Sequence, residues 1–112
     1  RKRGLFEVGD AFVALPGGLG TMEEIMEVMS WRQLNFHTKP IVFLNVAGFY
    51  TPILDFLEKS MALGFISQDC RKSYHACETP EQVIDYIKTY SAYSIDKGSI
   101  FAGNMAGSDW AA

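Results

Sequence analysis

The sequence predicts an α/β domain in which a parallel sheet carries helices on both faces. Three short apolar runs alternate along the chain with three segments of helical periodicity, which is the pattern of consecutive βα units. The run at 41–45 is apolar except for its last residue, as expected for a strand covered on both sides. Two of the helical segments begin with a threonine–proline pair, a common helix start.

The first predicted unit is a strand at 11–15 followed by a helix at 21–34. Between them, Pro16 opens a turn rich in glycine. Glu24 lies off the apolar face of this helix, and Trp31, seven residues further on, projects from nearly the same side as Glu24. The apolar residues that recur at helical spacing, and that we expect in the core, are Met22, Ile25, Met26 and Met29.

The second predicted unit is a strand at 41–45 and a helix with Thr51 as N-cap and Pro52 as its first residue, ending near Gly64. The third is a short strand at 73–77 and a helix introduced by a capping box, Thr79-Pro-Glu-Gln82. The predicted core residues of these two helices are Ile53, Leu54, Leu57, Met61, Val83, Ile84 and Ile87.

The residues divide into one domain at 1–93 and a mobile tail at 94–112. From Ser94 onward the chain consists of small and polar residues without clear periodicity, which favours a tail. Three strands make a thin parallel sheet, so we expect further strands upstream and interpret the chain as the C-terminal half of a Rossmann-like domain. Such a half would leave sheet edges exposed when isolated.

Composition excludes several classes of function. At 112 residues, 48% hydrophobic and with a formal charge of −3, the chain is typical of one soluble domain without the basic field that binding to a nucleic acid polymer needs. No apolar run approaches the roughly 18 residues of a membrane span, so we expect no membrane partner. The one basic cluster is the segment 1–3.

The two cysteines predict neither a metal site nor a disulfide. Cys70 and Cys77 flank His75 at a spacing that does not match zinc sites, and two more ligands would be needed to close one. Two thiols in a chain without a signal peptide indicate a reducing, cytoplasmic location.

The glycine turn is the strongest functional signal. Gly17, Gly18 and Gly20 permit backbone conformations that a Cβ would forbid and let main-chain amides approach an anion at the start of a helix. The structural alternative is that Thr21 and Glu24 form a capping box and that the glycines serve the turn alone. From that tetrapeptide by itself, the capping box is the favoured interpretation.

A longer set of residues favours a functional role for the turn. The pair Arg1-Lys2, then Pro16-Gly-Gly-Leu-Gly-Thr-Met-Glu-Glu24, the segment 31–40 and Asn45 together resemble the LOG family. These proteins are cytokinin riboside 5′-monophosphate phosphoribohydrolases, often mislabelled lysine decarboxylases. The family motif is an Arg-Lys pair followed by P-G-G-x-G-T-x-x-E, which this chain matches without a departure. The resemblance covers about residues 1–90.

The resemblance implies a Rossmann-like homodimer that hydrolyses the N-glycosidic bond of an N6-modified adenosine 5′-monophosphate or of AMP. Its products are free base and ribose 5-phosphate, and no cofactor is implied. By resemblance, Arg1 and Glu24 are catalytic. The residues that the resemblance assigns to substrate and phosphate binding are Arg1, Lys2, Gly17, Gly18, Gly20, Thr21 and Glu24.

The residue types suit this reaction on chemical grounds as well. Cleavage of a glycosidic bond develops positive charge on the ribose, which a nearby carboxylate such as Glu24 stabilises. A guanidinium such as Arg1 remains cationic and supplies donors to the departing base or to phosphate. The 5′-phosphate would lie at the start of helix 21–34, where unpaired amides and the helix dipole favour an anion.

Other interpretations remain open. A non-catalytic nucleotide-binding or molybdenum-cofactor-binding protein of the same superfamily would use a similar turn, and the combination of Arg1 with Glu24 favours the hydrolase over it. A dinucleotide-binding enzyme is disfavoured because G-x-G-x-x-G is absent at the turn. Lysine decarboxylation is disfavoured because neither Lys39 nor Lys59 lies in a recognisable pyridoxal phosphate site. We expect His37 to pack or face solvent rather than act in catalysis.

Overall fold

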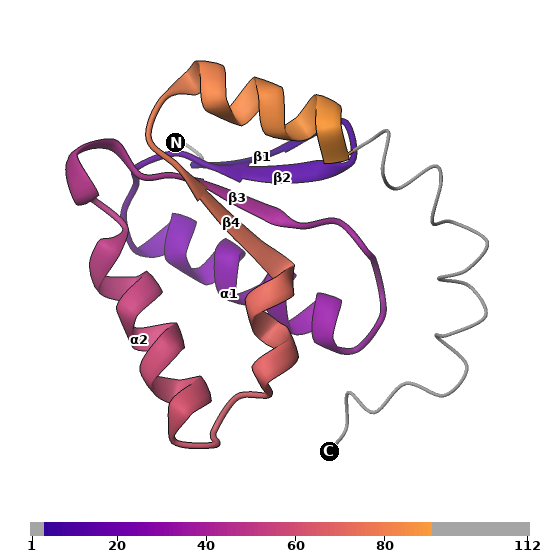
Figure 1. Cartoon of the computed structure of the whole chain (residues 1–112), viewed down its shortest axis with the longest axis vertical. Coiled ribbons are helices and arrows are strands. Elements are labelled where there is room, and N and C mark those ends of the chain that lie inside the picture. The colour runs from indigo at the N-terminus through magenta and orange to yellow at the C-terminus, as the bar shows by residue number, and fades with distance from the viewer. Residues whose placement is uncertain (1–3, 91–112) are drawn as a thin grey trace.

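The computed structural model describes residues 4–90, which form one sheet between two layers of helices (Figure 1). The strands are β1 (Leu5–Val8), β2 (Ala11–Ala14), β3 (Ile41–Leu44) and β4 (Tyr74–Cys77), side by side in that order. The helices are α1 (Leu19–Gln33), α2 (Thr51–Ala62) and a helix at 80–90, with short 3-10 turns η1 (Val46–Gly48) and η2 (Gln68–Ser73).

The predicted α/β class is confirmed. Strands β2, β3 and β4 are parallel, with Val13 opposite Val42 and Val42 opposite His75. Helices α1 and α2 lie on one face of the sheet and the helix at 80–90 lies on the other (Figure 1). All four residues of β3 are buried, as the uninterrupted apolar run predicted. The arrangement is that of a Rossmann-like fold.

The three predicted strands are all present and parallel, and a fourth strand that was not predicted, β1, runs antiparallel to β2. The two strands form a hairpin in which Val8 pairs with Ala11 across Gly9 and Asp10. Gly9 has φ +59°, which the first central residue of a II′ hairpin turn requires. A Gly-Asp pair between two strand-like runs is a hairpin signal, and Leu5-Phe-Glu-Val8 is mostly apolar, so β1 was readable from the sequence although it is mostly exposed.

Two apolar clusters hold the layers together, one on each face of the sheet. The first joins β2 and β3 to α1 and α2 through residues such as Ile25, Phe43 and Leu57, and the second joins the sheet to the helix at 80–90 through Val83. The core prediction is wrong for Ile84, which is 53% exposed. The other predicted core residues are buried or packed against a cluster, namely Met22, Ile25, Met26, Met29, Ile53, Leu54, Leu57, Met61, Val83 and Ile87.

The predicted start of the third helix is confirmed. Thr79 Oγ1 accepts a hydrogen bond of 3.2 Å from the amide of Gln82, while the Gln82 side chain accepts one of 2.8 Å from the amide of Glu78. The N-cap predicted for α2 is wrong by one residue, because the helix begins at Thr51 itself. The Thr51 hydroxyl instead accepts a hydrogen bond from Asn45 Nδ2 at 3.1 Å.

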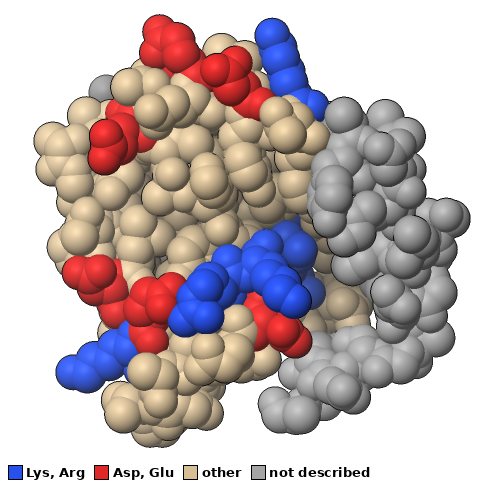
Figure 2. All heavy atoms as spheres, viewed as in Figure 1, with Lys and Arg blue, Asp and Glu red and all other residues tan. Residues whose placement is uncertain are grey.

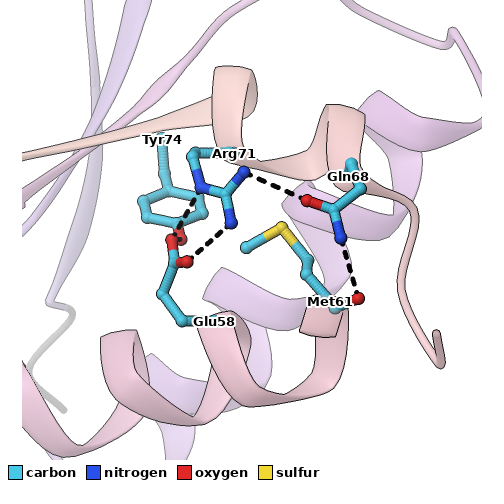
Figure 3. A network of polar contacts seen from close by, with 5 residues as sticks. All are labelled: Glu58, Met61, Gln68, Arg71 and Tyr74. Carbon is cyan, nitrogen blue, oxygen red and sulfur yellow. Dashed lines mark hydrogen bonds and ion pairs between the residues drawn. The ribbon is translucent and has the colours of Figure 1, made fainter. Parts of the chain in front are cut away.

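A polar network fixes α2 to the segment that leads into β4 (Figure 3). Glu58 of α2 accepts hydrogen bonds from Arg71 Nε at 3.0 Å, from Arg71 Nη2 at 2.6 Å and from the Tyr74 hydroxyl at 3.1 Å. Gln68 joins Arg71 to the backbone carbonyl of Met61. The Arg71 guanidinium lowers the pKa of the Glu58 carboxyl, whereas burial, followed by the bond to Glu58, raises the pKa of Tyr74 to about 12.

The charged side chains of the described residues are of both signs. On the face shown in Figure 2, the described Lys and Arg side chains lie beside Asp and Glu side chains and form no continuous basic surface. Ion pairs join Lys39 to Glu7 and Arg71 to Glu58. Within residues 4–90, every helix is too short or too polar to cross a bilayer. The predicted tail at 94–112 lies outside the described residues.

Candidate functional site

The predicted site lies where the three parallel strands end. The turn at 15–18 joins β2 to α1, the loop at 45–50 follows β3, and Glu78 follows β4. The amide of Asn45 donates to the carbonyl of Cys77 at 2.6 Å, so the ends of β3 and β4 are held together. Ligands of open α/β sheets bind outside the carboxyl ends of the strands. The glycine turn therefore occupies the edge at which this class of fold binds ligands.

Helix α1 begins earlier than its periodicity predicted. Its N-cap is Gly18, whose carbonyl accepts the first helical hydrogen bond from the amide of Met22 at 3.0 Å. No side chain caps this end. The first amides of a helix have no partner within the helix, and here Leu19, Gly20 and Thr21 provide them. Together with the helix dipole, these amides favour an anion at the turn.

The capping box at Thr21 and Glu24 is wrong. Thr21 is the third residue of α1, so Glu24 lies in its second turn and cannot reach back to the cap. Thr21 is only 6% exposed and packs under the turn, where a Cβ on Gly17 would come within 2.9 Å of the Thr21 Cβ. A Cβ on Gly4 would come within 2.7 Å of the Thr21 Cγ2. Thr21 therefore supports the turn from below instead of capping the helix.

Gly18 and Gly20 are glycine for a different reason from Gly17. Both are exposed, and a Cβ at either position would meet no heavy atom within 4 Å. Neither glycine has a positive φ, since the described glycines that do are Gly9, Gly48 and Gly64. Gly18 has φ −105° and ψ −148°, outside the regular helix and strand regions. Within residues 4–90, no packing contact requires glycine at these two positions. Their exposed backbone is open to close approach by a ligand.

Glu24 shares a face of α1 with the turn. Gly20 and Glu24 are one helical turn apart, and Trp31 follows two turns after Glu24. This face borders the buried face of α1, whose residues are Thr21, Ile25, Val28 and Met29. Glu24 is half-buried and Trp31 is 44% exposed, so both reach the surface, as the helical spacing predicted. The carboxylate is therefore placed beside the amide-rich start of the helix.

Two residues at this edge were not predicted to have a role. Tyr50 donates a hydrogen bond from its hydroxyl to the backbone carbonyl of Leu15, the residue just before the turn. Asn45 Oδ1 accepts a 2.6 Å hydrogen bond from the Tyr50 amide. A polar residue directly after a buried strand was the available signal for Asn45. The sequence has no signal for Tyr50, because its contact with Leu15 spans 35 residues.

Comparison with known proteins identifies the family. Residues 1–87 match the protein family described as "Possible lysine decarboxylase". This chain belongs to the LOG family. It is 42% identical over 90 residues to "Cytokinin riboside 5′-monophosphate phosphoribohydrolase LOG" of Oryza sativa subsp. japonica, an alignment that covers 80% of this chain and 37% of that protein.

Two other LOG relatives give the same result. "Probable cytokinin riboside 5′-monophosphate phosphoribohydrolase LOGL2" of Oryza sativa subsp. japonica is 44% identical over 91 residues, covering 81% of this chain and 37% of the relative. "Cytokinin riboside 5′-monophosphate phosphoribohydrolase LOG4" of Arabidopsis thaliana is 42% identical over 91 residues, covering 81% and 42%. The chain thus spans about two-fifths of the length of the relatives it matches.

The structure brings together only part of the site that the LOG resemblance assigned. Gly17, Gly18, Gly20, Thr21 and Glu24 all lie in the turn and the first two turns of α1. Arg1 and Lys2 lie outside the described residues. Their roles in catalysis and phosphate binding stay predictions.

His37 has a structural role in this LOG-family chain, as predicted. Its Nδ1 accepts a hydrogen bond of 3.0 Å from the amide of Lys39, and its Nε2 lies 2.9 Å from the carbonyl of Val28. Its ring also packs edge-on against Phe12. With both ring nitrogens and one ring edge engaged by the chain, His37 joins α1 to the segment before β3.

The cysteines do not converge on a metal site. Cys70 belongs to the apolar cluster on the face of α1 and α2, and Cys77 belongs to the cluster on the opposite face. Both are free thiols, and burial raises the pKa of each. His75 stacks on Tyr86 with ring centroids 4.2 Å apart. Across residues 4–90, no three His, Cys, Asp or Glu side chains are grouped to hold a metal ion.

Proposed function

We propose that the protein hydrolyses the N-glycosidic bond of adenosine 5′-monophosphates, with AMP or its N6-modified forms as substrates. The observation that carries the proposal is the open surface at Gly18 and Gly20, where bare amides at the start of α1 are accessible and no part of the described chain requires glycine. Relatives with 42–44% identity are named as phosphoribohydrolases of cytokinin riboside 5′-monophosphate, which supports the same class of substrate.

The 5′-phosphate is held at the turn in this proposal. Its oxygens accept hydrogen bonds from the first amides of α1, and the positive end of the helix dipole offsets part of its charge. Glu24 lies on the same helix, so two anionic groups come close together once the nucleotide binds. The basic pair Arg1-Lys2 would compensate for this repulsion.

The reaction itself needs a carboxylate and a hydrogen-bond donor. A water oxygen attacks C1′ of the ribose, the bond from C1′ to the base nitrogen breaks, and its electron pair leaves with the base, which takes up a proton. Glu24 stabilises the positive charge that develops on the sugar and orients the water. Arg1 donates hydrogen bonds to the departing base or to the phosphate. Free base and ribose 5-phosphate are the products.

Homodimerisation and a cytoplasmic location belong to the same proposal. The buried free thiols of Cys70 and Cys77 suit a reducing compartment. Exposed apolar side chains on the described surface, such as Phe65 at 83% and Leu63 at 62%, supply area for contact with a second subunit. The proposed chemistry uses acid, base and electrostatic groups of the protein and names no cofactor.

Hydrolysis fits the described lysines better than decarboxylation does. Lys39 precedes β3, so it lies at the end of the sheet opposite the glycine turn, and its ammonium is paired with Glu7. Lys59 is exposed near the C-terminal end of α2. A lysine that forms a Schiff base needs a desolvated or otherwise activated amine. Neither of these two lysines is placed to share a site with the anion-binding turn.

The test is an assay of free base released by the intact protein from AMP and from isopentenyladenosine monophosphate. The matching nucleosides, which lack the phosphate, are the controls. We expect release from the monophosphates and a loss of on the order of 10²-fold or more in kcat/KM with the nucleosides, because they forgo the charge-assisted bonds at the turn. Tight binding of AMP without release of adenine would instead favour a non-catalytic nucleotide-binding protein.

A further inference from the structure

The backbone carbonyl of Leu15 is the last one before the glycine turn. The pairing of β2 with β3 ends at Ala14, which lies opposite Phe43. The amide of Leu15 still donates to the carbonyl of Gly4 at 2.6 Å. The carbonyl of Leu15 lies beyond the last residue pair of β2 and β3. The next residue is Pro16, which has no amide proton to offer. The Tyr50 hydroxyl is the described donor to this carbonyl.

Tyr50 is held rigidly in the position from which it makes this bond. The residue is 1% exposed, and its ring packs edge-on against Phe43 and Phe49 at centroid distances of 5.0 and 4.9 Å. Its amide donates to Asn45, and its carbonyl accepts the helical bond from Leu54 at 3.0 Å. Burial raises the pKa of Tyr50, so its hydroxyl stays protonated as a donor at neutral pH.

Two contacts, one on each side, therefore fix the position of the turn. On the strand side, the Tyr50 hydroxyl holds the Leu15 carbonyl. On the helix side, the buried side chain of Thr21 fills the space under Gly17. The segment between them carries the accessible glycines. Loss of either contact would let the start of α1 shift relative to the sheet.

We infer that Tyr50 is a positioning residue for the anion-binding turn, through its hydrogen bond to Leu15. It does not touch the ligand. It sets the path by which the chain leaves β2, and so it sets where the first amides of α1 point. This role rests on the proposed function for its effect on substrate, but its effect on the turn itself is independent of any activity.

The test compares Tyr50→Phe with Tyr74→Phe in the intact protein. The two tyrosines are closely matched, because both pack edge-on against Phe43 and both make one hydroxyl hydrogen bond. Only the Tyr50 bond reaches the turn, whereas that of Tyr74 reaches Glu58. Each substitution keeps the ring and removes one hydroxyl.

The first readout is hydrogen exchange at the amides of Leu15 and Met22, which flank the turn and donate to Gly4 and Gly18. We expect exchange about five- to tenfold faster in Tyr50→Phe, the factor that corresponds to losing one ordinary hydrogen bond. Tyr74→Phe should leave both amides unchanged. Equal exchange in the two variants would overturn the inference, whatever the protein's activity proves to be.

The second readout separates binding from chemistry. With AMP as substrate we expect Tyr50→Phe to raise KM about five- to tenfold and to change kcat less, because the substitution shifts the amides that bind the phosphate. Tyr74→Phe should change neither. A fall in kcat alone, with KM as in the wild type, would contradict a role in positioning the phosphate. If the wild type releases no base, the proposed function fails and the exchange measurement still decides the role of Tyr50.

Discussion

Thr21 lies directly under Gly17 at the junction of β2 and α1, so closely that a Cβ on Gly17 would come within 2.9 Å of the Thr21 Cβ. This contact explains why Thr21 is buried although Gly18 and Gly20 of the same motif are exposed. Gly17 is required by the protein's own packing, whereas Gly18 and Gly20 face open space. The three glycines of one motif thus divide into a structural residue and two residues available to a ligand.

Gly17→Ala is expected to destabilise the fold. The added methyl must displace Thr21, which is 6% exposed and has little room to move. Overpacking of this kind costs about 1–3 kcal/mol in free energy of unfolding. Urea denaturation of the intact protein measures it. The control is Gly17→Ala combined with Thr21→Ala, which removes the Oγ1 atom nearest to the added Cβ and should recover part of the loss. No recovery would argue against the Thr21 contact as the cause.

Gly18→Ala and Gly20→Ala are expected to separate binding from stability. Their Cβ atoms meet nothing within 4 Å, so neither substitution creates a clash. Gly20→Ala inside α1 should raise stability by up to about 1 kcal/mol, whereas Gly18→Ala should lower it modestly, because Gly18 is the N-cap and alanine is unfavourable there. A methyl on the anion-facing side would nevertheless block the backbone. We expect a loss of about tenfold or more in AMP affinity, or about 1.4 kcal/mol, by calorimetry. Unchanged affinity in both variants would show that the phosphate does not bind at this turn.

Glu24→Gln should abolish most turnover without affecting folding. Glutamine is as good a helix former as glutamate, and the capping role that could have confounded the result is absent. We expect kcat to fall on the order of 10²–10³-fold, the effect of deleting one electrostatic stabiliser. Glu23→Gln is the matched control, since Glu23 is the exposed neighbour on the same helix. Equal rates in the two variants would exclude a catalytic role for Glu24.

Arg32→Met should leave the protein as stable as the wild type or make it more stable. The Nη1 atom of Arg32 is buried and has no hydrogen-bond partner among residues 4–90, and burial lowers the pKa of the guanidinium. Methionine keeps the aliphatic packing and removes the buried charge. Removal of that charge should increase the free energy of unfolding by about 1 kcal/mol or leave it unchanged. Arg71→Met, which removes an exposed ion pair with Glu58, should have little effect on stability. A clear loss of stability in Arg32→Met, measured in urea, would mean that its guanidinium is satisfied.

Stability should fall at alkaline pH through Tyr74. Its pKa is raised from 10.0 to about 12 in the folded protein, so folding favours the protonated phenol. The resulting stabilisation is complete below pH 10 and is lost as the pH rises through about 12. Tyr74→Phe should therefore show a smaller drop in Tm than the wild type between pH 9 and about 12. Parallel Tm curves for the two proteins would rule out a contribution from this residue.

Sequence alone determined most of the local elements of this protein and the family to which it belongs. Apolar spacing gave the βα alternation, threonine and glutamine gave the start of the last helix, and glycine gave the turn at 16–20. These signals are readable because each depends on residues within one or two helical turns of one another. The family motif also added the expectation of a nucleotide substrate.

Tertiary structure decided which of these residues support the site and which are free to bind. The sequence offered a helix-capping role for Thr21, whereas in the structure its side chain is buried against Gly4 and Gly17. Tyr50 reaches Leu15 across 35 residues, and β1 joins the sheet through backbone pairing with β2 although three of its four residues are exposed. Contacts between distant segments depend on how the layers pack, and the order of residues along the chain does not specify that packing on its own.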